Sequence, residues 1–560
     1  MEANLWMACG NGLGHVVDMH RNACKAPWAE ATHGESVPVY EMQIRPTGAA
    51  GRASGWRTAI PMFSLALVLA VTAIASAAPA TTAWAGSAAD GGNRELPTVV
   101  GLVTAGQFRE ASARIDAALR QPGVPALTRE ALQFQLARMQ RMRQDFSLTA
   151  NQVEAAVRKQ IPDLTDAEFG SWDTQGLFEH MYIDGKRMYF VRSPSNLFHL
   201  SAEARARSRA PVSFADSGLS KQSTEDITEY DRKVIARTRT MGHPSVLPQR
   251  VRVTQFVTVD ADAVRPGKTI HAWIPYPRDI PGQQEDIRFV ASQPGGHRIA
   301  PRSALQRTVY LEKTARAHQP TVFSVTYEVT LYAQYHAIDP SKVVRARITP
   351  ELAPYVAERA PHIVFTEPLR VFSRQVVGTA TNPYRIAQKI FAAVDGIPWA
   401  GAREYSTIAD LSAYTLRAGH GDCGEQTMLL ITLMRLNGIP ARWQSGWFFS
   451  RGGDNDIHDW AEIYLAPYGW VPVDVTYGRL ESGDPSLAWF YLGGLDNFRI
   501  AFNDDFSQAF VPPKQFFRSD DVDSQRGEVE SDDNLYYDKW SYHFEWKILS
   551  PERQVESPVG

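Results

Sequence analysis

The chain has 560 residues, of which 44% are hydrophobic and 21% charged, and its formal net charge is -3. Single hydrophobic cores stop growing beyond roughly 250 to 300 residues, so this length predicts several domains. The charge is nearly balanced and the basic residues are scattered, which gives no electrostatic basis for nucleic acid or an anionic membrane surface as the main partner.

Residues 42–85 have the three parts of a secretory signal peptide. A region with arginines is followed by the apolar residues 60–80 (IPMFSLALVLAVTAIASAAPA) and by Ala83-Trp84-Ala85, an A-x-A cleavage site. The alternative is an uncleaved signal anchor, because the apolar run is nearly long enough to span a bilayer. We expect residues 1–41 to be a non-native or disordered extension, and the mature protein to be exported, either periplasmic or secreted.

The cysteines support this division. Cys9 and Cys24 precede the signal, so a mature protein that begins near Gly86 contains a single cysteine, Cys423. Such a protein forms no internal disulfide, and its lone thiol is either buried and inert or reactive.

Residues 86–215 are expected to form a helical module with a β-hairpin. Apolar residues recur at helical spacing in residues 108–119 and 132–139, and Thr165 to Glu168 has the pattern of a capping box. In FEHMYIDGKRMYFV, two strand-like runs flank Asp184-Gly185, which is a strong hairpin signal.

Residues 216–345 are expected to form a β-sandwich-like domain that serves as a spacer or binding platform. Segments such as RVRVTQFVTVDA and TVFSVTYEVTLYAQY alternate apolar and polar residues, as antiparallel strands with one wet face do. The catalytic core is placed at residues 346–500. The tail, 501–560, is expected to pack on that core, with an edge strand at residues 542–546.

The segment GHGDCGEQTMLLITLMRLNGIPAR, residues 419–442, predicts a helix that begins at Cys423. Asp422 is a good N-cap, Glu425 completes a capping box, and Asn437-Gly438 ends the helix. At the first helical position the helix dipole and the unpaired N–H groups lower the pKa of a thiol, so a thiolate nucleophile is here as good an interpretation as a buried, inert thiol.

A nucleophilic thiol needs a base, and the base needs a partner that orients it. Two predicted strands, IHDWAEIYL and GWVPVDVTYG, carry His458 and Asp474. If Tyr464 pairs with Tyr468 across a three-residue connection, His458 and Asp474 stand directly opposite each other on one face. A four-residue connection would place them on opposite faces.

Three separated blocks, GDCGEQTMLLITLMRLNGIPARWQSGW, HDWAEIYL and GWVPVDVTYG, resemble the core of the transglutaminase-like superfamily over roughly residues 385–500. The resemblance implies an α+β, papain-like fold in which a helix that bears the cysteine packs on an antiparallel sheet. It also implies Cys423 as nucleophile, His458 as general base and acid, and Asp474 as the residue that orients the histidine. The implied reaction is acyl transfer on protein or peptide amides through a thioester, ending in hydrolysis or transamidation.

Neighbouring residues are candidates for substrate contacts. Those we expect to line the site are His420, Trp443, Trp447, Trp460 and Glu462. The tryptophans could equally be ordinary core aromatics, and Glu462 could belong to a polar network. Trp399 and Tyr405 are candidates for a side chain that donates a second hydrogen bond to the oxyanion. Asp459 should face away from His458, because successive residues of a strand point to opposite faces.

The sequence predicts no organic cofactor and no obligatory metal, because it has no phosphate-binding glycine loop and no metal-ligand motif. The expected partner is a protein or peptide substrate, such as a cell-wall peptide, and membrane contact is expected only if the signal is uncleaved. The competing hypothesis is a non-catalytic binding or scaffold protein with the same fold.

Overall fold

The structure, a computed structural model, describes residues 95–209, 224–450, 453 and 455–549. These residues all belong to one unit, Ala77–Gly560. The predicted extension and the predicted signal peptide lie outside the described residues. Within the part described, no helix is long and apolar enough to cross a bilayer.

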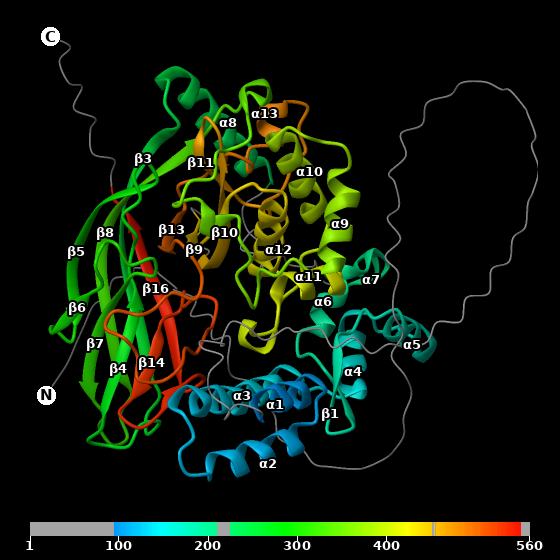
Figure 1. Cartoon of the computed structure of the whole chain (residues 1–560), viewed down its shortest axis with the longest axis vertical. Helices are drawn as coiled ribbons and strands as arrows, with labels where there is room; N and C mark the ends of the chain where they lie inside the picture. The colour runs from blue at the N-terminus through cyan, green and yellow to red at the C-terminus, as the bar shows by residue number, and fades with distance from the viewer. Residues whose placement is uncertain (1–94, 210–223, 451–452, 454, 550–560) are drawn as a thin grey trace, which may run out of the picture. The chain divides into compact units, whose positions relative to one another are not determined.

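The amino-terminal part is helical with a β-hairpin (Figure 1). Its helices are α1 (Glu95–Thr104), α2 (Phe108–Leu119), α3 (Ala126–Asp145), α4 (Ala150–Gln160), α5 (Asp166–Thr174), α6 (Ser193–Leu200) and α7 (Ala202–Arg207). Strands β1 (His180–Ile183) and β2 (Lys186–Tyr189) pair around Asp184-Gly185, as predicted. Both turn residues have positive φ, 50° and 85°, which a tight hairpin turn with the strands' own twist requires. The predicted capping box also forms, and Thr165 caps α5.

Helix α8 (Thr224–Met241) leads into a β-sandwich. In the described residues, one five-stranded sheet has the order β12-β8-β3-β16 with β5 also paired to β8, and the other has the order β15-β14-β4-β7-β6. The strands from the predicted sandwich region are β3 (Ser245–Val259), β4 (Thr269–Pro275), β5 (Gln284–Gln293), β6 (His297–Ile299), β7 (Thr308–Thr314) and β8 (Thr321–Tyr335). Alternate residues of β3, β8, β4 and β7 share one buried apolar cluster, which is the core expected between two stacked sheets.

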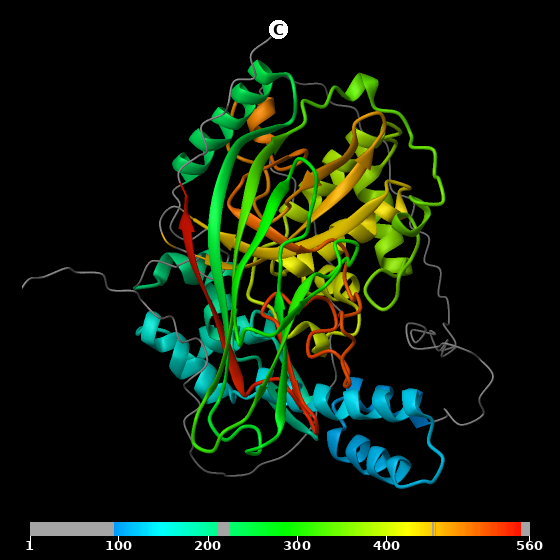
Figure 2. The same cartoon turned by 90° about the vertical axis from the view of Figure 1, so that its left-hand side faces the viewer.

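Strands from the far end of the chain complete this sandwich. They are β12 (Gly494–Leu495), β14 (Glu528–Ser531), β15 (Leu535–Tyr536) and β16 (Trp540–Ile548). Figure 2 shows β16, in red, beside β3, and it is an edge strand as predicted. The sequence prediction assigned the tail to the core, and the tail does contact it, since Gln525 bonds to Asp459 and Phe544 of β16 stacks on Trp447. The prediction did not include the strands that the tail adds to the sandwich. Strand pairing between segments some 280 residues apart leaves no local signal in the sequence.

The core combines helices with a four-stranded antiparallel sheet of order β11-β10-β9-β13, counted over the described residues. The strands are β9 (Ala441–Phe449), β10 (Asn455–Leu465), β11 (Gly469–Val473) and β13 (Arg499–Asn503). The helices are α9 (Glu367–Val377), α10 (Pro383–Asp395), α11 (Leu411–Ala418), α12 (Cys423–Leu436) and α13 (Pro485–Ala488), and three short 3-10 turns are η2 (Pro340–Lys342), η3 (Ala353–Tyr355) and η4 (Tyr405–Thr407).

Helix α12 is the centre of the core. Every residue from Gly424 to Arg435 is buried, and the helix packs against α10 and α11 as well as β9 and β10. Most of the helix after its first turn is apolar, and its polar side chains are buried with hydrogen-bond partners, as when Arg435 donates to the Ala441 carbonyl oxygen. Its enclosure fixes the position of its first residue, Cys423.

The connection between β10 and β11 corrects the predicted register. Leu465 pairs with Gly469, so the connection is three residues long but lies one residue later than predicted. The predicted pair Tyr464 with Tyr468 is therefore wrong, because Tyr464 pairs with Trp470. An odd-length connection preserves which residues share a face. His458 and Asp474 thus lie on the same face, as predicted. They do not stand directly opposite each other, and both lie beyond Ala461 and Val473, the last residues paired between β10 and β11.

Candidate active site

The amino terminus of α12 is held by a capping box, as the sequence predicts. The Glu425 N–H donates to Asp422 Oδ1 at 3.0 Å, and the Asp422 N–H donates to Glu425 Oε2 at 3.1 Å. The Tyr405 hydroxyl, from η4, donates to the same Asp422 oxygen at 2.8 Å. A Cβ on Gly424 would come within 2.0 Å of that hydroxyl, which explains the glycine after Cys423.

His458 lies near the start of β10, and Asp474 directly follows the end of β11, so the antiparallel pairing brings the two residues together. His458 Nε2 lies 2.7 Å from Asp474 Oδ2, and both side chains are buried. Asp474 Oδ1 accepts the backbone N–H groups of Thr476 and Tyr477. Burial alone would raise the pKa of Asp474, but the charges and hydrogen bonds of His458 and Arg499 outweigh it and hold the pKa well below its usual range. Asp474 is therefore a fixed anion in contact with the imidazole.

Arg499 is a site residue that the sequence analysis missed. It begins β13, is 2% exposed, and places Nη1 2.5 Å from Asp474 Oδ2. Its other amino group pairs with Asp496, and its guanidinium lies 5.3 Å from the Trp460 ring and 5.0 Å from the Tyr477 ring. An Asp and an Arg three residues apart in an apolar stretch, LDNFRIAF, is a signal that could have indicated a buried ion pair.

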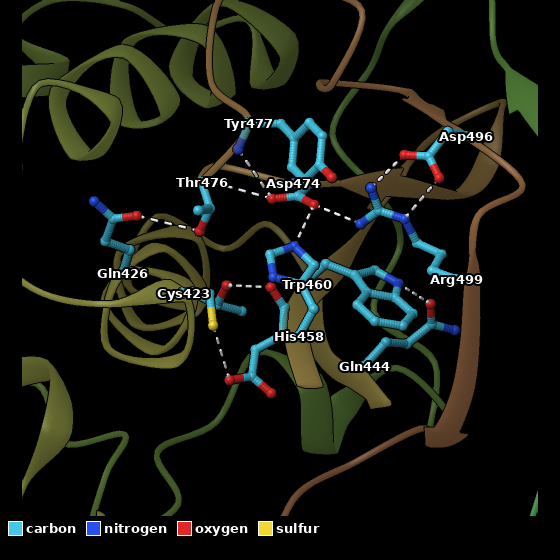
Figure 3. Close-up of polar contacts among 12 residues, drawn as sticks. Cys423, Gln426, Gln444, His458, Trp460, Asp474, Thr476, Tyr477, Asp496 and Arg499 are labelled. Atoms are coloured by element: carbon cyan, nitrogen blue, oxygen red, sulfur yellow. Dashed lines mark hydrogen bonds and ion pairs between the residues drawn. The ribbon is translucent and has the colours of Figure 1, made fainter. Parts of the chain in front are cut away.

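The thiol of Cys423 bonds to Asp459, whereas the role of nucleophile predicts His458 as its partner. Its sulfur donates to Asp459 Oδ2 at 3.5 Å, and not to His458 (Figure 3). In that view the imidazole of His458 lies beside Asp474, while the sulfur of Cys423 points away from the ring. Asp459 does face away from His458, as predicted.

The environment of the Cys423 thiol shifts its pKa in the direction opposite to the predicted one. Burial and the nearby charges of Asp459 and Asp422 raise the pKa of Cys423 well above its usual range. The expectation that the helix start lowers this pKa is wrong for the described conformation, because burial of the thiol and the charges of Asp459 and Asp422 outweigh the dipole of one helix.

The three predicted aromatic contacts are core residues. Trp443, Trp447 and Trp460 each have no exposed surface, and the first two belong to the large apolar clusters of the core and the sandwich. An indole with no exposed surface cannot touch a substrate in this conformation. The prediction that they line a substrate cleft is therefore not met, and the alternative of core aromatics describes them.

The two polar candidates have structural partners. Glu462 is buried and pairs with Arg442 at 2.6 Å, so it belongs to a polar network. His420 is half-buried and meets the ring of Tyr414 edge-on at 6.3 Å. Burial lowers the pKa of His420, which keeps the ring neutral beside the site. The oxyanion candidate Tyr405 directs its proton to Asp422.

A comparison with protein families finds a match within the core. Residues 370–475 match the model of the transglutaminase-like superfamily. The chain carries a transglutaminase-like core. This segment includes Cys423, His458 and Asp474, and it ends before Arg499. A comparison with curated proteins finds no match.

Solved structures similar to this chain include three bacterial proteins. One is a provisionally assigned cysteine protease of Cytophaga hutchinsonii, with 16% identity, a TM-score of 0.37, and coverage of 55% of this chain and 93% of that one. The periplasmic domain of TgpA from Pseudomonas aeruginosa, bound to ethylmercury, shows 14% identity, a TM-score of 0.21, and coverage of 46% and 95%. A provisionally assigned protease of Parabacteroides distasonis shows 10% identity, a TM-score of 0.16, and coverage of 46% and 68%.

Proposed function

We propose that this protein catalyses thiol-dependent acyl transfer on peptide or protein amides, with Cys423 as nucleophile, His458 as general base and acid, and Asp474 as the residue that orients His458. The observation that carries the proposal is the buried His458–Asp474 pair, 2.7 Å between Nε2 and Oδ2, beside the helix that begins at Cys423. A histidine anchored through Nε2 keeps Nδ1 for the sulfur. The family match over residues 370–475 supports the same assignment.

The reaction begins when the Cys423 proton passes to His458 Nδ1 and the sulfur attacks the amide carbon. A C–S bond forms, and the carbonyl oxygen becomes an oxyanion that the backbone N–H of Cys423, at the first position of α12, stabilises. His458 then protonates the departing amine, the C–N bond breaks, and a thioester remains on Cys423. Asp474 stabilises the imidazolium that exists between these two proton transfers.

The acceptor decides the product. Water gives hydrolysis, which is the reaction of a cysteine protease or amidase, and a primary amine gives transamidation. The signal-like residues 42–85 support a proposal of export, so we propose a protein or peptide substrate outside the cytoplasm, such as a cell-wall peptide.

The proposal is tested by amine release from a panel of fluorescent peptides with internal amide bonds and with glutamine side chains. Cys423→Ala and His458→Ala should each lower kcat by about 10³-fold or more. His318→Ala is the matched control, because His318 is exposed and bonds only at the surface of the sandwich with Asp262. Activity that survives Cys423→Ala would refute the proposal. Added hydroxylamine separates the two outcomes, since it captures the acyl group as a hydroxamate if amines reach the thioester.

A second candidate is a non-catalytic binding protein with the same core. The hydrogen bond from Cys423 to Asp459 rather than to His458 favours it, because a thiol that never turns to the imidazole transfers no proton to it. A protein that shows no amine release and no labelling of Cys423 by an electrophilic peptide would support this candidate.

A further inference from the structure

A buried pair of carboxyl groups lies next to the thiol and has no part in the proposed reaction. Asp459 Oδ2 is 3.5 Å from the Cys423 sulfur, and the carboxyl group of Asp523, from the tail, forms a hydrogen bond with Asp459. Asp459 and Asp523 are 2% and 1% exposed. Among the described residues, neither makes an ion pair with a basic side chain.

The tail also sets the orientation of this pair. Gln525 Nε2 donates to Asp459 Oδ1 at 2.8 Å and to the backbone oxygen of His458 at 2.7 Å. The amide therefore holds Oδ1, and Oδ2 is left facing the sulfur and the Tyr405 hydroxyl, which lies 3.2 Å away. Asp523 is held in turn by Trp443 Nε1 at 3.3 Å. Residues outside the predicted triad thus fix the position of Asp459 Oδ2.

Two adjacent buried carboxyl groups cannot both be ionised near neutral pH, so the pair holds one proton and one negative charge. Burial, the charge of the neighbouring Asp523 and that of Asp422 raise the pKa of Asp459, which agrees with a shared proton. The remaining charge is delocalised beside the sulfur. It favours S–H as a hydrogen-bond donor and opposes a thiolate at this place.

We propose that Asp459 is the resting partner of Cys423: with Asp523 it keeps the sulfur protonated and turned away from His458, and the thiol becomes nucleophilic only when it leaves Asp459 for the imidazole. The inference rests on the proposed function in taking Cys423 as the nucleophile, and it adds a residue that touches the reacting sulfur. Its consequence is a resting site without a thiolate–imidazolium pair. Because oxidants attack the thiolate and not the thiol, the resting Cys423 is protected from oxidation.

The test is the pH dependence of alkylation of Cys423 by iodoacetamide, in which the thiolate displaces iodide and the thiol proton goes to solvent. The titratable groups that face the sulfur are Asp422, Asp456, Asp459, His458, Tyr405 and, behind Asp459, Asp523. The wild-type protein should show an apparent thiol pKa above the free value of about 8.5. A wild-type value below this would overturn the inference without any variant.

Two isosteric variants separate a specific role from a structural one. Asp459→Asn replaces the carboxylate by an uncharged amide, and because Gln525 Nε2 donates to the Oδ1 position, the amide turns its NH2 group and not its oxygen to the sulfur. Alkylation at pH 7 should then become at least about tenfold faster, the effect of one pKa unit on the thiolate fraction. Asp523→Asn removes the neighbouring carboxyl group and leaves the single negative charge of the pair on Asp459, beside the sulfur, so alkylation should be no faster than in the wild type. Equal acceleration in both variants, or none in Asp459→Asn, would overturn the inference.

A second measurement covers the case in which a variant unfolds. Thiolate absorbance near 240 nm in the wild-type protein, compared with Cys423→Ala, titrates the same group without alkylation or replacement of Asp459. Alkylation does not require turnover, so the two proposals fail separately. Absence of amide turnover refutes the proposed function and leaves the thiol titration intact, and a low thiol pKa refutes the inference and leaves the function intact.

Discussion

Replacement of Asp474 by asparagine should destabilise the core. Each oxygen of this carboxylate accepts two hydrogen bonds, so an NH2 group fits at neither position. Oδ2 accepts from His458 Nε2 at 2.7 Å and from Arg499 Nη1 at 2.5 Å. Oδ1 accepts from the N–H groups of Thr476 and Tyr477 at 3.1 Å and 3.3 Å. An asparagine must put its NH2 group in place of one oxygen, so either orientation sets it against two donors.

The magnitude follows from the burial of the pair. Removing one partner of a buried ion pair costs about 3–5 kcal/mol, and the lower end applies here because Arg499 retains Asp496. The folded-state pKa of Asp474 is lowered, so its stabilisation is fully present above the unfolded value of about 3.9 and is lost as the pH falls through the folded value. The difference between wild type and variant should therefore be constant from pH 8 to pH 5 and shrink only below about pH 4.

The assay is urea unfolding at pH 5 and pH 7, followed by the fluorescence of the buried tryptophans of the core. Asp484→Asn is the control, because Asp484 is exposed and caps the short helix α13, a position where asparagine serves equally well. It should change the free energy of unfolding by less than about 0.5 kcal/mol. A loss below about 1 kcal/mol for Asp474→Asn, or a loss that varies between pH 5 and pH 8, would refute the reasoning.

Two further substitutions test other parts of the site and its supports. Burial and the charge of Glu404 raise the pKa of Asp145 to about 7. Its ionisation in the folded protein therefore lowers the free energy of unfolding by up to about 4 kcal/mol as the pH rises from about 4 to 7. Asp145→Asn should flatten the pH dependence of the urea midpoint, and an unchanged slope would contradict this. Gly424→Ala places a Cβ 2.0 Å from the Tyr405 hydroxyl and should lower stability in thermal unfolding by about 1–3 kcal/mol. Gly101→Ala in α1 has open space around the new Cβ and should be neutral or stabilising, so equal losses in both variants would refute the steric account.

The parts of the fold that could be predicted from the sequence are those with a local cause. The start of α12 follows from Asp422 and Glu425, whose side chains close the capping box within four residues. The hairpin at Asp184-Gly185 follows from the turn chemistry. The shared face of His458 and Asp474 depends only on an odd-length connection, so it survived an error of one residue in the register.

The parts that could not be predicted depend on contacts between distant segments. Arg499 reaches Asp474 only because β13 pairs with β9, and the tail residue Asp523 reaches Asp459 only because the chain returns over β10. The same return explains the wrong prediction for the thiol of Cys423. Helix position alone argues for a low pKa, but burial of the thiol, which raises the pKa most, and the charge of Asp459 depend on segments that the fold brings around Cys423.

The most direct test of the central claim is the intact mass of the protein quenched in acid during turnover of an activated peptide amide. Acyl transfer through Cys423 predicts an adduct of the acyl mass on the peptide that contains residue 423, formed no more slowly than amine release and absent from Cys423→Ala. Amine release without such an adduct, or an adduct that persists in Cys423→Ala, would contradict the account.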